Sequence, residues 1–252
     1  MVHKFNRQFL FILEFIFFIL IFTFTAQAQV SPKEMLEKAD EARGSYEGVE
    51  VTVTMESNEL GRKQYRVMKV SEKGYNCFLD TLAPSNVKGQ RILMRDRNLW
   101  YANPGLSKPV PVSPRQKLIG VAVNGDIVST NYTRDYKIVS TQDSILKGED
   151  CTLMNLEAVD KRTTYDRIKY WISKDRLVGV KGEFYTVSGK MFKSATFEYN
   201  NKITVNGKPR DFISKAIITS AIIKDDFTII DYSKPVQKII PDALFNVNLL
   251  TK

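Results

Sequence analysis

Hydrophobic and polar residues alternate along most of this chain with the period of a β-strand. The clearest case is residues 49–56, VEVTVTME, in which every second residue is apolar. Such alternation predicts a strand with one buried face. Turn signals containing Gly, Asn, Asp or Ser separate the apolar runs, so we expect sequential antiparallel hairpins. The expected strands are residues 49–56, 64–70, 75–82, 92–94, 99–101, 135–140, 151–159, 167–173, 177–186, 190–200, 212–220 and 227–232.

Helical patterns occupy only two parts of the chain. Ser31-Pro32 is a helix start followed by Glu34, and Gly44 is a stop signal, which predicts a helix over residues 31–43 with a narrow apolar stripe. The stretch 103–135 is rich in proline and breaks the strand rhythm. Within it, residues 116–123 and 124–130 resemble one or two short helices.

One hairpin predicts apolar side chains on both faces of the sheet. If Asp96-Arg97 is its turn, Leu93 lies opposite Trp100 on one face. The apolar neighbours of these two residues then lie on the other face. A helix layer on one side and a second apolar layer on the other are expected from this arrangement.

Residues 1–28 have the pattern of a cleaved export signal. Lys4 and Arg7 precede an apolar run over residues 9–24, and Ala-Gln-Ala at 26–28 is a cleavage site of small residues. We therefore expect residues 29–252 to be a soluble exported protein that forms one domain. An uncleaved anchor is the alternative, and Glu14 inside the run keeps it open.

Cleavage would remove His3, the only histidine of the chain. Residues 29–252 then cannot build a Ser-His-Asp triad or a histidine-ligated zinc site, and they contain no dinucleotide or phosphate-loop signature. We expect a binding protein with no enzymatic activity, cofactor or metal. A carboxylate-pair or Ser-Lys enzyme is chemically open, but no pattern places such residues together.

The chain is basic, with a formal net charge of +9, and contains two cysteines. The basic residues are scattered, and outside the cytoplasm lipid headgroups are available anionic partners, so we expect no nucleic-acid partner. Cys77 and Cys151 fit no metal spacing. They would form one disulfide or remain two buried thiols.

Four segments resemble the LolA-like superfamily of outer-membrane lipoprotein-sorting proteins, and most closely its branch of larger periplasmic proteins. The segments are PSNVKGQ at 84–90 with the RILMRDRNLWYANPGLSKPVPVSP that follows, NGDIVSTNYTRDY at 124–136, YWISKDRLVGVKGEFYTVSGKMFKSATF at 170–197 and IPDALFNVNLL at 240–250. Their order and spacing span most of residues 29–252.

The resemblance implies a mainly β (α+β) fold. It would be a strongly curved antiparallel sheet forming a half-barrel, with an N-terminal helix and short mid-chain helices over the concave side. The implied function is a periplasmic carrier that shields acyl chains of a lipid or lipoprotein in an apolar cavity on the way to the outer membrane. A non-enzymatic accessory module of an envelope export complex, with a filled core, is the alternative. The implied partners are acyl chains, an inner-membrane transporter and an outer-membrane acceptor, and we expect a monomer.

Candidate binding residues follow from the apolar strands and from the proline-rich bridge. We predict that Arg115 and Lys117 meet headgroups at the cavity mouth, with ordinary solvated cations as the alternative. For the two tryptophans and the methionine, ordinary core packing is the alternative. The predicted cavity lining is Val51, Val53, Met68, Leu93, Trp100, Trp171, Phe184 and Phe197.

Overall fold

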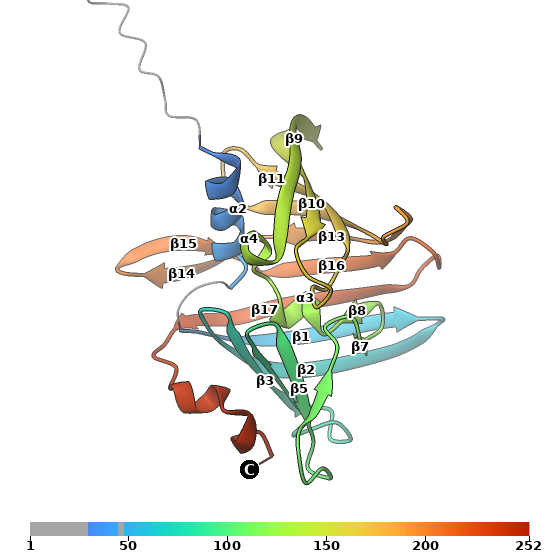
Figure 1. Ribbon diagram of the computed structural model, residues 1–252, viewed down its shortest axis with the longest axis vertical. Helices are drawn as coiled ribbons and strands as arrows, with labels where there is room; N and C mark the ends of the chain where they lie inside the picture. Colours follow the sequence, from blue (N-terminus) through green and yellow to red (C-terminus); the bar gives the residue numbers. More distant parts are fainter. Residues whose placement is uncertain (1–29, 45–47, 252) are drawn as a thin grey trace, which may run out of the picture. The chain divides into compact units, whose positions relative to one another are not determined.

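The fold is built on one long antiparallel sheet. The computed structural model describes residues 30–44 and 48–251, and residues 32–252 form one compact unit. The predicted signal peptide lies outside the described residues. Within them, 13 strands pair in the order β6-β5-β4-β3-β2-β1-β17-β16-β13-β12-β11-β10-β9 (Figure 1). Because β1 pairs with β17, the first and last strands of the sheet meet at its centre.

The strands of this sheet correspond closely to the alternating segments of the sequence. They are β1 Val49–Glu59, β2 Arg62–Lys73, β3 Asn76–Ala83, β4 Arg91–Arg95, β5 Asn98–Ala102, β6 Val110–Val112, β9 Tyr136–Leu146, β10 Glu149–Ala158, β11 Arg167–Ser173, β12 Gly179–Tyr185, β13 Met191–Glu198, β16 Lys215–Ser220 and β17 Phe227–Gln237. Two short hairpins stand apart from it, β7 Lys117–Ile119 with β8 Ala122–Val123, and β14 Asn201–Val205 with β15 Lys208–Phe212.

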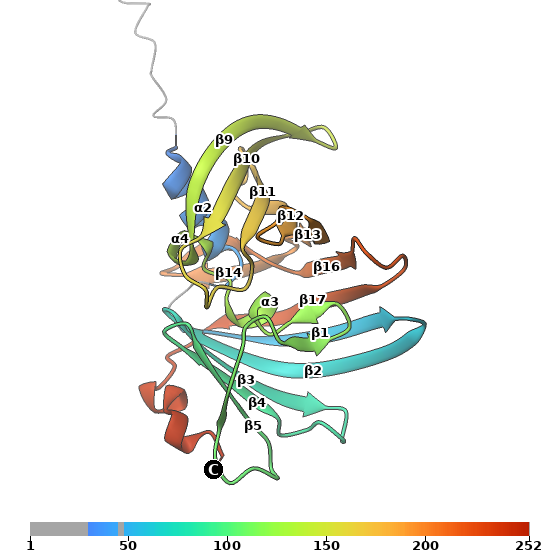
Figure 2. The same ribbon diagram turned by 45° about the vertical axis from the view of Figure 1, so that its right-hand side comes forward.

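The sheet curves around a few short helices (Figure 2). These are α2 Pro32–Glu41, α3 Gly125–Val128 and α4 Tyr132–Asp135, and two 3₁₀ helices, η1 Asp242–Phe245 and η2 Val247–Leu249, follow the last strand. No helix among the described residues combines the length and apolar character that spanning a membrane requires. The predicted fold class, a curved antiparallel half-barrel with few helices, is confirmed.

The strand registers define two faces. Val53 pairs with Met68 on β2 and with Tyr232 on β17, so these three side chains share one face. We call this the concave face, because α2, α3 and α4 lie on it. Leu93 pairs with Trp100, as predicted, and both lie on the opposite, outer face together with Phe78.

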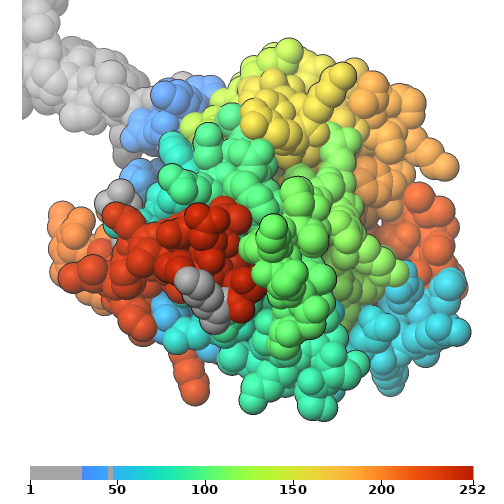
Figure 3. Space-filling view, turned by 60° about the horizontal axis from the view of Figure 1, so that its bottom comes forward, coloured from blue at the N-terminus to red at the C-terminus, as the bar shows by residue number. Residues whose placement is uncertain are grey.

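The C-terminal residues cover part of the outer face. Ile240, Phe245 and Leu250 form a buried cluster with Leu93 and Ala102, and Phe78 and Trp100 pack against it. Figure 3 shows this segment in red, lying over the strands β3 to β5 in teal. Arg91 fastens its end by a hydrogen bond from Nη1 to the carbonyl oxygen of Leu250 at 3.1 Å.

Two expectations of secondary structure were wrong. Helix was predicted over residues 116–123, but residues 117–123 form the hairpin β7–β8, because the chain turns sharply at Gly120, whose φ is +54°. The single strand predicted over 212–220 is broken between β15 and β16. The break places the amide of Ile213 2.8 Å from the carbonyl oxygen of Ala42, so this strand end bonds to the end of α2 instead of to the ladder. The hairpin β14–β15 was not predicted.

The C-terminal cover is expected to contribute substantially to stability. Phe245→Ala should lower the free energy of unfolding by about 3 kcal/mol, because it removes a buried aromatic side chain from the cluster on Leu93. Urea unfolding followed by tryptophan fluorescence measures this. Ile239→Ala is the control, since that side chain is 94% exposed in the same segment. Equal effects of the two substitutions would contradict this role of the C-terminal segment.

Candidate functional site

The concave face is mainly apolar, with buried side chains contributed by strands from both halves of the sheet. Val51 and Val53 of β1 and Met68 of β2 lie on it and are buried. Phe184 of β12 and Phe197 of β13 lie on the same face, and both are buried. These five predicted lining residues therefore share one surface.

Three predicted lining residues face the other way. Leu93 and Trp100 lie under the C-terminal segment on the outer face. Trp171 alternates with Tyr170, which points to the concave side, and its ring lies beneath the ammonium of Lys181 at 4.5 Å. Their prediction as lining of the concave side was wrong, because apolar character alone does not tell the two faces of a sheet apart.

Residues 114–135, which we call the covering segment, lie across the concave face. The turn of β7–β8 rests on the central strands, where the amide of Val121 donates to the hydroxyl of Thr228 at 3.1 Å. A side chain at Gly120 would place its Cβ 2.4 Å from Cβ of Ser57, so only glycine permits this approach. Further along, the ring of Tyr132 on α4 meets that of Tyr170 edge-on at 5.2 Å.

A buried ion pair fastens the middle of the covering segment to the sheet. Nζ of Lys193 on β13 lies 2.8 Å from Oδ2 of Asp126 on α3, and both side chains are almost fully buried. The hydroxyl of Tyr165 donates to the other oxygen of Asp126. Lys193 also donates to the carbonyl oxygen of Val121 at 3.3 Å. Removing one partner of such a buried pair leaves an uncompensated charge and costs about 3–5 kcal/mol.

A second ionic contact fastens the end of the covering segment. Oδ1 of Asp135 lies 2.7 Å from Nε of Arg97 and 2.8 Å from Nε of Arg134. Its other oxygen accepts a hydrogen bond from Ser129 at 2.9 Å. Arg97 stands in the turn between β4 and β5, whereas Asp135 leads into β9. This contact therefore joins the two ends of the sheet across its concave side.

The two predicted headgroup residues lie along the covering segment and are already paired. Nη2 of Arg115 lies 2.8 Å from Oδ1 of Asp166, and its Nε donates to the carbonyl oxygen of Thr163 at 3.0 Å. Lys117 pairs with Glu59 at the end of β1. Both are about half exposed, so a role with headgroups stays a prediction.

A buried arginine lies at the centre of the concave side. The guanidinium carbon of Arg43, just after α2, is 4.9 Å from the ring centre of Tyr132 and 4.6 Å from that of Phe197. Among the residues that the structure describes, Nε and Nη1 of this arginine have no hydrogen-bond partner, and neither do the hydroxyls of Tyr170 and Tyr199. The interior is therefore apolar at its walls and contains a small set of polar groups.

Two buried carboxyls accompany this arginine. Burial raises the pKa of Glu72 to about 8, although attraction to Arg43 and a hydrogen bond with Cys77 lower it. Burial likewise raises the pKa of Asp40 to about 7, against the lowering effect of the hydrogen bond from the amide of Thr133 at 2.7 Å. Both groups therefore favour the neutral form.

The cysteines and the potential metal ligands were the remaining candidates for redox or metal chemistry. Cys77 and Cys151 are free, buried thiols. Among the residues that the structure describes, no group of three or more His, Cys, Asp or Glu side chains could hold a metal ion.

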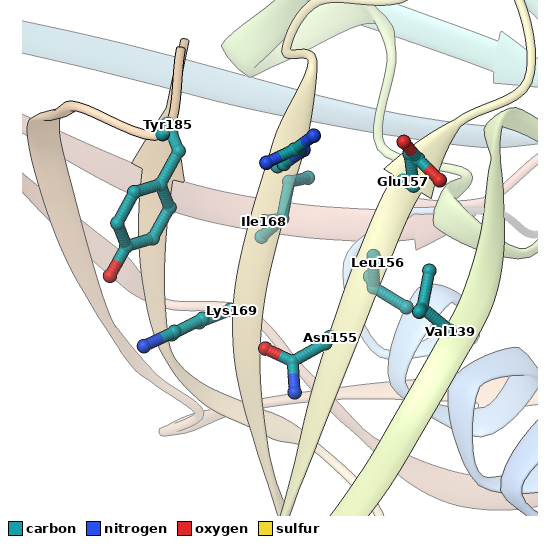
Figure 4. Close-up of a pocket in the computed structure, with 9 residues that line it drawn as sticks. Val139, Asn155, Leu156, Glu157, Ile168, Lys169 and Tyr185 are labelled. Carbon is teal, nitrogen blue, oxygen red and sulfur yellow. The ribbon is translucent and has the colours of Figure 1, made fainter. Parts of the chain in front are cut away.

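A groove of about 490 Å³ lies elsewhere, on strands β9 to β12 (Figure 4). Asn155, Lys169 and Tyr185 contribute to it from three neighbouring strands, at positions that alternate with the concave-face residues. It is open and mixed in polarity, with Glu157 and Arg167 both in its lining. It therefore lacks the enclosed apolar character that an acyl chain needs.

The residues predicted from the sequence did not include Arg43, Asp126, Lys193 or Asp135. A signal existed for Arg43, because it lies seven positions after Leu36 and so continues the apolar stripe of the helix. A charged residue on such a stripe indicates a buried charge. No local signal pairs Asp126 with Lys193, since 67 positions separate them.

A long curved sheet that wraps around one helix and a covering segment defines a half-barrel protein with a closed apolar interior. A family model described only as that of an uncharacterized protein matches residues 74–252. A solved LolA superfamily protein from Nitrosomonas europaea is 29% identical with a TM-score of 0.78, over 86% of this chain and 98% of that one. No curated protein matches the chain.

Two further structures share the fold at lower identity. A putative outer membrane lipoprotein-sorting protein domain from Vibrio parahaemolyticus is 18% identical with a TM-score of 0.74, over 87% of this chain and 98% of that one. A DUF1329 family protein from Desulfovibrio piger is also 18% identical, with a TM-score of 0.70, over 85% of this chain and 95% of that one. This chain belongs to the LolA-like superfamily, as its sequence resemblance predicted.

The buried carboxyls predict how stability depends on pH. The unfolded chain releases the Glu72 proton above about pH 4.5, whereas the folded chain keeps it up to about pH 8. Its stabilising contribution is therefore complete at low pH and is lost as the pH rises through this window. Glu72→Gln should flatten the decline in unfolding free energy between about pH 5 and pH 8, by on the order of 1 kcal/mol or more.

Urea unfolding at several pH values measures this dependence. Glu56→Gln is the matched control, because Glu56 lies on the neighbouring strand β1 and is exposed. If the unfolding free energy of Glu72→Gln declines with pH as steeply as that of the unaltered protein, the raised pKa of Glu72 is contradicted.

Proposed function

We propose that this protein carries acyl chains of a lipid or lipoprotein across the periplasm and shields them on the concave side of its sheet. One observation carries the proposal: the mainly apolar concave face is covered by a separate segment that two ionic contacts fasten. The surface includes Val53, Met68, Phe184 and Phe197. Membership of the LolA-like superfamily also supports a role as a lipoprotein-sorting carrier.

An acyl chain that crosses water needs a protein to cover it. Exposing an acyl chain to water costs about 0.8 kcal/mol per CH₂, or on the order of 10 kcal/mol for a chain of about 14 carbons. Burial in an apolar interior removes that cost without any chemical step. A carrier must also release its cargo, and a cover fastened by ionic contacts can leave while the sheet stays folded.

Cargo would enter by displacement of the covering segment. Val53, Met55 and Met68 are fully buried beneath it, so space for a chain arises only when the segment moves. Methionine side chains suit the exposed wall because they adapt to different chains. Loading by an inner-membrane transporter and delivery to an outer-membrane acceptor complete the proposal. The apparent export signal at residues 1–28 supports the location.

The second candidate is a non-enzymatic accessory module whose interior stays closed. The complete burial of the concave face favours it. Such a module would bind a partner protein through its surface and no acyl chain at all. Both candidates agree with a chain that contains no histidine beyond His3.

Native mass spectrometry separates the two candidates. Protein purified without detergent should carry a lipid or lipoprotein mass, which organic extraction identifies and a fluorescent fatty acid displaces. A clean mass with no uptake of any acyl probe would remove the carrier and leave the accessory module.

A variant of the buried ion pair tests the route of entry. Lys193→Met should raise the rate of fatty-acid uptake severalfold, because it releases the covering segment from β13 at Asp126. Stopped-flow fluorescence measures the rate. Lys174→Met is the matched control, since it removes only the exposed pair with Asp143. Uptake at the same rate in both variants would show that the covering segment is not the entrance.

A further inference from the structure

Three hairpin turns end at the same edge of the sheet. In the strand order β2-β1-β17-β16-β13-β12, the turns β1–β2, β16–β17 and β12–β13 all lie at one end, because neighbouring strands run in opposite directions. Figure 1 shows the first two projecting side by side on the right. We call residues 60–63, 187–191 and 221–225 the turn rim.

Hydrogen bonds hold these turns together as one surface. The side-chain amide of Asn58 donates to the carbonyl oxygen of Asp225 at 2.9 Å, and the backbone amide of Leu60 donates to Oδ1 of Asp226 at 2.7 Å. The amide of Ala221 donates to the carbonyl oxygen of Phe192 at 2.9 Å. The three turns therefore act as one edge and not as separate loops.

Each turn of the rim exposes a large apolar side chain. Leu60 is 72% exposed, Val187 69% and Ile222 62%. Ile223 and Met191 are also exposed. Behind the rim, a hollow of about 360 Å³ is lined by Tyr65, Phe227 and Ile229 among others. Apolar groups in these positions remain in water unless another phase or partner covers them.

Basic side chains accompany the apolar ones in every turn. Arg62 and Lys63 follow Leu60, Lys190 precedes Met191, and Lys224 follows Ile223. None of these four cations takes part in an ion pair with the residues that the structure describes. Nearby, Asp226 accepts from Leu60 and Glu59 pairs with Lys117. The rim itself contains one carboxylate, the exposed Asp225, so the four cations leave it with a formal net charge of +3.

We propose that the turn rim docks on the surface of an anionic lipid bilayer. Apolar side chains at the tips of turns would enter the interface, and the adjacent cations would meet the phosphates of the headgroups. A protein interface instead has a contiguous core from which charged residues are depleted, which the rim does not have. The proposal stands on the rim alone and does not depend on acyl-chain carriage.

Vesicle flotation tests the proposal. The exported chain, its N-terminal residue checked by mass spectrometry, is mixed with vesicles of phosphatidylcholine alone or with added phosphatidylglycerol. The protein should bind the anionic vesicles more tightly, and salt should weaken the binding. Arg62→Gln with Lys63→Gln should lower the partition coefficient at least about tenfold, since each basic residue near an anionic surface contributes about fivefold. Leu60→Ser with Ile222→Ser should lower it as well.

Matched controls come from elsewhere on the sheet. Val139→Ser with Ile145→Ser removes two apolar side chains of β9 that are 60% and 74% exposed. Lys147→Gln with Lys174→Gln removes two cations from turns at the opposite end of the strands. Both control variants should bind vesicles like the unaltered protein.

Several outcomes would overturn the proposal. The first is that the protein does not bind anionic vesicles, and the second is that rim and control variants lose vesicle binding equally. The third is a change of oligomeric state in the rim variants, which would assign the rim to contact with a second copy of the chain. Fatty-acid uptake measured in the same variants separates the two proposals. Fatty-acid uptake should be unchanged when the rim is altered. If the unaltered protein takes up no fatty acid, only the proposal of acyl-chain carriage is refuted.

Discussion

Strands β3 to β5 carry apolar side chains on both of their faces, so both faces have to be removed from water. One layer cannot do this, and the chain supplies two. The covering segment and α2 lie on the concave face, and the C-terminal segment lies on the outer face over Leu93 and Trp100. The order of the sheet makes this possible, since β1 and β17 meet at its centre and the C-terminal residues emerge beside the first strands.

The two covers are held by different forces. The outer cover is an apolar cluster around Phe245, and polar contacts join the segment to the sheet from Lys73 to Asp242 and from Arg91 to the carbonyl oxygen of Leu250. The inner cover is fastened by two ion pairs, the buried pair of Lys193 with Asp126 and the partly buried pair of Arg97 with Asp135. Burying a pair of charges adds little net stability, because desolvation offsets most of the attraction. What such a pair adds is a defined position for the segment, together with a contact that a competing charge or water can break.

The polar groups inside the apolar interior also fit an inner cover that can open. Arg43, Asp40 and Glu72 are expensive to bury, and a core selected only for stability would replace them. Departures of this kind from ordinary core composition occur mainly at functional sites. In this chain they lie where the first helix, the covering segment and the sheet meet, which is the region that opens if cargo enters.

Local sequence patterns predicted most strands of the long sheet, the first helix and the register of the β4–β5 hairpin. These depend on local alternation, on capping residues and on turn chemistry, all of which lie within a few residues of one another. The sequence also indicated the family, through the order of four segments. Its prediction of helix over residues 116–123 failed, because the chain turns at Gly120 in a left-handed conformation and packs closely on Ser57, and this tertiary contact outweighs local preference. Which face of the sheet is concave became clear only in the folded chain, where Val53 and Phe197 lie inside and Leu93, Trp100 and Trp171 do not. The fold also decided the pairing of Lys193 with Asp126, because contacts between residues far apart in the chain depend on how the whole sheet curves and leave no mark in the local pattern.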